Sequence, residues 1–103
     1  MTELSPLEEF DKLEQVASWM LSIVLAYEKG ALDRNTASAL ARRAQKKIKK
    51  HSPNDSERDH KDTIEELCIS LSTIDRAVGS FEKFYLASLK EEIETIIKTL
   101  KDG

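Results

Sequence analysis

Residues 5–30 read SPLEEFDKLEQVASWMLSIVLAYEKG, and this stretch decides the fold class. Ser5 can cap a helix, Pro6 fits the first helical position, and Glu8 completes a Ser-x-x-Glu capping box. Apolar residues then recur every three or four positions, which is the period of one face of an α-helix. They are Leu7, Phe10, Leu13, Val16, Ala17, Met20, Ile23, Val24 and Tyr27. Gly30 is a typical C-terminal stop, so the stretch predicts a helix over residues 5–29.

The second half of this helix is apolar on nearly every side. Trp19, Leu21, Leu25 and Ala26 all fall outside the main stripe. A helix of this kind is central in a bundle, or it also contacts a second chain.

A second helix is expected over residues 33–51, with Asp33 as its cap. Its apolar positions cluster on one side at about 100° per residue. They are Ala37, Leu40, Ala41, Ala44 and Ile48. The short link from Gly30 to Leu32 makes the first two helices an antiparallel hairpin.

The rest of the chain carries two further apolar stripes behind the loop Ser52-Pro53-Asn54-Asp55, and Ser56 to Asp59 offers another cap. The stripes are Ile64, Leu67, Cys68, Leu71, Ile74 and Val78, then Tyr85, Leu89, Ile93, Ile96 and Leu100. They predict helices over 57–78 and 80–101 if the chain breaks at Gly79-Ser80. A continuous helix would be about 64 Å long and would demand a dimer.

Helix-length statistics favour the break. We therefore predict an all-α fold: one domain over residues 1–103, a small antiparallel bundle of four helices. A third and fourth helix merged into one long kinked helix, giving three in all, is the alternative.

The charge of the chain is segregated. From Arg34 to His51 there is no acidic residue, whereas both flanking segments are acidic and the whole chain has a net charge of −3. The basic strip consists of Arg42, Arg43, Lys46, Lys47, Lys49 and Lys50, opposite the apolar side of the second helix.

Three interpretations of the basic strip stay open. It is a solvated face paired with nearby acids, a docking surface for an anionic protein, or a phosphate-binding surface for nucleic acid. The net negative charge and the absence of aromatic residues from the strip weaken the nucleic-acid interpretation. The acids that could fold back over the strip are Asp55, Glu57, Asp59, Asp62, Glu65 and Glu66.

We expect no metal site and no cofactor. Asp55, Glu57, Asp59 and Glu66 have the spacing of a calcium loop, but His60 stands where the loop requires Gly. Asp62 also stands where the loop requires an apolar residue. His51 and His60 lack further ligands at zinc spacing, and we expect both to be exposed to solvent.

No motif for catalysis is present. The single cysteine, Cys68, lies on an apolar stripe and is expected to be a core residue. No phosphate-binding loop and no Ser-His-Asp order occur, so we expect no enzyme and no small-molecule substrate. The acidic N-terminus, the lone cysteine and the lack of a membrane-spanning stretch predict a soluble, cytoplasmic protein without membrane association.

The apolar second half of the first helix and the C-terminal apolar stripe, with the aromatic residues beside them, supply the candidates for self-association, because exposed aromatics are favoured at interfaces. The set is Trp19, Ile23, Phe81, Tyr85 and Ile96. For Phe81 and Phe84, burial in a broad core is the favoured interpretation. For Trp19, burial in the core and contact at an interface are equally favoured.

The sequence thus predicts a non-catalytic helical protein-interaction module: a small, self-associating adaptor, regulator or subunit. A nucleic-acid-binding accessory protein that uses the basic strip is the first alternative. An immunity-type or inhibitor protein that masks a charged target is the second.

Overall fold

The protein is a four-helix bundle. The computed structural model describes residues 10, 12–55, 57–76 and 79–102, with only the backbone for residues 79–82. The helices are α1 (Leu13–Glu28), α2 (Arg34–Lys50), α3 (Lys61–Ser72) and α4 (Gly79–Asp102), with a 3-10 turn η1 (Ile74–Arg76) before α4. The described residues contain no strand. The all-α prediction is confirmed, and the merged third and fourth helix is wrong because α3 ends at Ser72.

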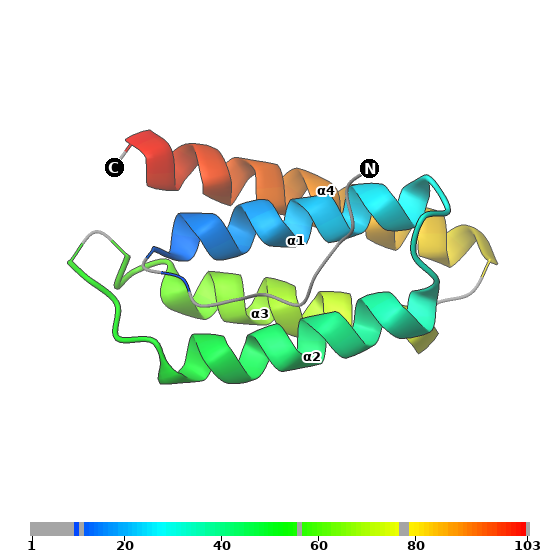
Figure 1. The fold of residues 1–103 in the computed structure, drawn as a ribbon. Helices are drawn as coiled ribbons and strands as arrows, with labels where there is room; N and C mark the ends of the chain where they lie inside the picture. The colour runs from blue at the N-terminus through cyan, green and yellow to red at the C-terminus, as the bar shows by residue number, and fades with distance from the viewer. Residues whose placement is uncertain (1–9, 11, 56, 77–78, 103) are drawn as a thin grey trace.

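The helices lie side by side in an elongated body of 40 × 24 × 24 Å (Figure 1). Helix α1 packs most closely against α4, and α2 packs most closely against α3. The core between them contains residues from all four helices and from η1. None of the described helices is long and apolar enough to cross a lipid bilayer.

Helix α1 begins later than the sequence predicts. The expected start at Ser5, Pro6 and Glu8 lies outside the described residues, but Phe10 and Lys12 are described and neither is helical. The Gln15 side chain accepts a hydrogen bond from the backbone N–H of Lys12 at 3.0 Å. This contact satisfies a donor that a helix start would otherwise leave free.

Helix α1 ends as predicted. Gly30 has a φ of +81°. Its N–H donates to the Tyr27 carbonyl, and the Ala31 N–H donates to the Ala26 carbonyl at 2.9 Å. This pair of bonds is the Schellman arrangement that closes many helices on a left-handed glycine.

The cap of α2 is also confirmed. The Asp33 side chain accepts a hydrogen bond from the Thr36 N–H at 2.7 Å. A hydrogen bond from the Thr36 side chain and this backbone bond together hold the pKa of Asp33 below its ordinary value. The apolar side of α2 is buried as expected, so its opposite side is the only one left for charged residues.

The connection between α3 and α4 differs from the prediction. Gly79 is the first residue of α4, and the interruption comes earlier, after Ser72. The hydroxyls of Ser72 and Thr73 donate to the carbonyls of Ile69 and Ser70, at 2.6 and 2.8 Å. Such local bonds compete with the next helical hydrogen bonds, which explains why α3 stops here.

Candidate functional site

The six basic residues predicted to form a surface, Arg42, Arg43, Lys46, Lys47, Lys49 and Lys50, are all exposed on the outer side of α2. We call this set the basic face. Its inner counterparts Ala37, Ala41, Ala44 and Ile48 are completely buried. Burial of the alanines against the neighbouring helices therefore fixes the direction in which the cations point.

Two acids of the segment behind the loop are engaged away from the basic face. Asp55 pairs with Arg58 at 3.4 Å, and Glu57 turns into the protein. Arg42 pairs instead with Asp75 of η1, at 3.1 Å.

The rest of the basic face is largely unpaired. Within the part of the chain that the structure describes, no acidic oxygen lies within 4 Å of the cationic groups of four members. These are Arg43, Lys46, Lys49 and Lys50. At these four positions the interpretation of a self-neutralised strip therefore has no support.

The sequence interpretation misplaced Glu57, which it grouped with the acids that could cover the basic strip. Glu57 is 4% exposed, and its carboxylate accepts hydrogen bonds from the N–H groups of Leu13 and Asn54, at 2.5 and 3.2 Å. Asn54 in turn accepts from the Glu57 N–H at 3.0 Å. The Asn-x-x-Glu spacing is a capping-box signal that could have marked this turn. The contact with Leu13, 44 residues away, has no local signal.

His51 is part of the same cluster. Its Nε2 lies 3.2 Å from the Glu57 carboxylate, and its ring centroid lies 5.0 Å from that of Phe10. The side chain is 14% exposed, and His60 is half-buried. The expectation that both histidines face solvent is therefore wrong, because the loop folds back against the start of α1.

The pKa shifts of Glu57 and Cys68 both favour the form of each group that is present at neutral pH. Burial opposes ionisation of Glu57, but hydrogen bonds from Leu13, His51 and Asn54 outweigh it and lower the pKa of this carboxyl. Burial raises the pKa of the Cys68 thiol to about 12. Cys68 is completely buried, as expected, and its Sγ donates to the Ala41 carbonyl at 3.1 Å.

The residues predicted for self-association have different locations. Ile23 is completely buried and Ile96 is 6% exposed, so both belong to the chain's own core rather than to a free surface. Trp19 is half-buried against that core. The half-buried Tyr85 has its hydroxyl bonded to the Ser70 carbonyl at 2.5 Å. The side chain of Phe81 lies outside the described residues.

Phe84 is the exception among the aromatic residues whose side chains the structure describes. It is 80% exposed, so the expectation that the core buries it is wrong. It lies on the outer side of α4, because Leu86, Leu89 and Ile93 occupy the inner side.

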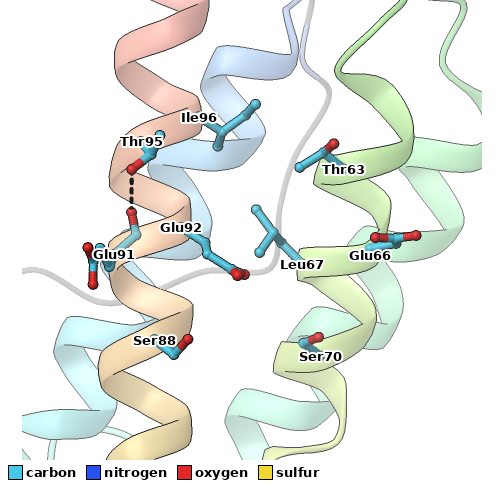
Figure 2. Close-up of a pocket in the computed structure, with 9 residues that line it drawn as sticks. All are labelled: Thr63, Glu66, Leu67, Ser70, Ser88, Glu91, Glu92, Thr95 and Ile96. Carbon is cyan, nitrogen blue, oxygen red and sulfur yellow. Dashed lines mark hydrogen bonds between the residues drawn. The ribbon is translucent and has the colours of Figure 1, made fainter.

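A groove of about 560 Å³ separates α3 from α4 (Figure 2). Leu67 and Ile96 are its apolar residues, and Thr63, Ser70, Ser88 and Thr95 contribute hydroxyls. Glu92 points across the gap toward α3, whereas Glu91 and Glu66 lie on the outer rims of α4 and α3 (Figure 2). We call these nine residues the acidic groove. Helical periodicity is enough to place Glu91 and Glu92 on the polar side of α4. It does not reveal that this side of α4 and Glu66 of α3 line the same groove.

The described residues contain no group of three His, Cys, Asp or Glu side chains arranged to hold a metal ion. A comparison with protein-family models, with curated proteins and with solved structures gives no match for this chain.

Proposed function

We propose that this chain is a non-catalytic protein-interaction module whose basic face binds an anionic surface on a protein partner. The supporting observation is the row of exposed cations on α2, among which Arg43, Lys46, Lys49 and Lys50 have no acidic partner within 4 Å in the described part of the chain. An exposed set of like charges on one rigid helix attracts an opposite surface and orients it.

A non-catalytic function agrees with the state of the buried titratable groups. The Glu57 carboxylate is engaged in hydrogen bonds, and the Cys68 thiol is buried with a raised pKa. A general base or nucleophile requires the opposite arrangement, with an accessible group whose pKa lies near the working pH. A single buried thiol also suits the reducing cytoplasm, which is the proposed site of action.

Nucleic acid is the second candidate partner, because six exposed cations on one helix side can neutralise phosphates. A protein partner is favoured over it for two reasons. The net charge of the chain is −3, which opposes a polyanion at long range. The basic face also lacks an aromatic side chain on which a base could stack.

The test is an affinity pull-down, with and without nuclease, using the wild type and the variant R43E/K46E/K50E. A matched control is K83E/K98E/K101E, which reverses three exposed cations on α4 and changes the net charge equally. Lys50 and Lys101 both lie in the last turn of their helices, so the effects on the helix dipole are matched too.

The proposal expects a protein that the wild type and the control retain after nuclease treatment and that R43E/K46E/K50E loses. Capture that disappears with nuclease would identify nucleic acid as the partner instead. Equal capture by all three proteins would mean that the basic face has no function in binding.

A further inference from the structure

We infer that the acidic groove binds the basic face of a second copy of this chain. The inference rests on the proposed use of the basic face as a docking surface, and it names one anionic partner for that surface. It differs from the self-contact predicted from the sequence, since Ile23 and Ile96 of that set are core residues.

The two surfaces have complementary charge. Glu66, Glu91 and Glu92 are exposed, and no cationic nitrogen lies within 4 Å of their carboxylates among the described residues. The unpaired cations of α2 lie on a different element, and α2 contributes no residue to the groove. One molecule therefore carries both an unpaired basic face and an unpaired acidic groove. The basic face of one copy can bind the acidic groove of a second copy.

The two surfaces also match in length. Arg43 and Lys50 are seven residues apart on α2, which corresponds to about 10 Å along the helix axis. The α4 side of the groove extends from Ser88 to Ile96, which corresponds to about 12 Å. A helix laid along the groove would place its lysine ammonium groups near the glutamates.

Phe84 extends this acceptor surface. It lies one helical turn before Ser88 and therefore on the same side of α4. With 80% of its surface exposed, its ring can receive an arginine guanidinium in a cation–π contact. Arg43 lies at the N-terminal end of the unpaired cations and is the candidate donor.

Complementary variants provide the test. The face variant is R43E/K46E/K50E, and the groove variant is E66K/E91K/E92K. Sedimentation velocity measures the mass of each protein alone and of their equimolar mixture, at about 0.05 M and about 0.5 M salt. Formation of a complex in the mixture also shows that both variants remain folded.

At low salt, we expect the weight-average mass of the wild type to rise with concentration above its monomer mass of 11.7 kDa. Each variant alone should stay monomeric, because each has lost one of the two surfaces. The mixture should form a one-to-one complex, because one intact face then meets one intact groove. High salt should dissociate both assemblies, since exposed charges are screened.

F84A gives a second measurement that does not depend on charge. Because the side chain is exposed, the substitution should leave the melting temperature unchanged. It should weaken self-association about two- to fivefold, as expected for loss of one exposed cation–π contact. The control is I69A, which removes another exposed apolar side chain, 41% accessible, that does not line the groove.

The inference would be overturned if the wild type stays monomeric at every concentration. It would also be overturned if the wild type assembles but the face variant and the groove variant stay monomeric in their mixture. Dimerisation of the face variant alone would also overturn the inference, because the contact between copies would then not use the basic face. These results are separable from failure of the proposed function. If pull-down still loses a protein partner with R43E/K46E/K50E, the basic face has a partner other than this groove.

Discussion

A single carboxylate, that of Glu57, joins the start of α1 to the loop between α2 and α3. Its oxygens accept from the N–H of Leu13, the first residue of α1, and from the loop residues His51 and Asn54. A negative charge at a helix N-terminus also interacts favourably with the helix dipole. Glu57 thus caps the N–H of Leu13, whereas Gln15 of α1 itself satisfies the N–H of Lys12.

Replacing Glu57 by Gln should reduce the free energy of unfolding by about 1–3 kcal/mol, because a buried charge-assisted acceptor is lost. Urea unfolding at neutral pH measures this change. The control D59N alters a nearby exposed carboxylate and should stay within about 0.5 kcal/mol of the wild type. Equal effects of the two substitutions would show that the Leu13 contact contributes nothing.

The same carboxylate should make stability depend on pH. The pKa of Glu57 is lower in the folded protein than its ordinary value. Its contribution is therefore complete above roughly pH 4.3, the value in an unfolded chain, and is lost as the pH falls through the folded pKa. We expect the difference in unfolding free energy between wild type and E57Q to shrink in that window. A difference that stays constant down to the acid transition would contradict this assignment.

At the scale of the elements, local chemistry at the helix ends sets the lengths of α1, α2 and α3. Asp33 caps α2, Gly30 ends α1, and the hydroxyls of Ser72 and Thr73 end α3. The Gly30 stop matters most for the hairpin, because the chain must reverse there between α1 and α2.

Gly30→Ala should lower the free energy of unfolding by about 1 kcal/mol, the approximate cost of a left-handed conformation for a residue with a Cβ. No atom lies within 4 Å of a Cβ added at this position, so the cost is conformational and not steric. Gly30→Asn should cost less, because asparagine tolerates this region better. The midpoints of chemical denaturation report both values, and a larger loss for Asn than for Ala would refute the explanation.

At the scale of the whole molecule, α1 packs inside the bundle, which is one of the two alternatives that its apolar pattern leaves open. Six of its residues are buried, among them Met20, Ile23 and Val24, and it contacts all three other helices. Trp19, Leu21 and Leu25 on its other sides are only half-buried, so the apolar circumference of α1 is used inside the chain only in part. The surfaces that we propose for partners are made by α2 and by the pair α3 and α4.

Ile23→Ala should destabilise the monomer by about 2–5 kcal/mol, because it leaves a cavity in a closely packed core. Ile69→Ala removes the same atoms from a site that is 41% exposed and should cost less than about 1 kcal/mol. Thermal and urea unfolding under monomeric conditions compare the two. A small loss of stability in Ile23→Ala together with a large loss of self-association would instead show that Ile23 lies at an interface between chains.

The sequence by itself determined the helices and the direction of the basic face. Both follow from contacts three or four residues apart, as in the alanine stripe of α2, and from caps such as Asp33 and Gly30. Only the tertiary structure decided that Glu57 caps α1, that Ile23 and Ile96 are internal, and that Glu92 faces α3. Those facts depend on how separate helices pack, and no local pattern encodes which residue of one helix meets which residue of another.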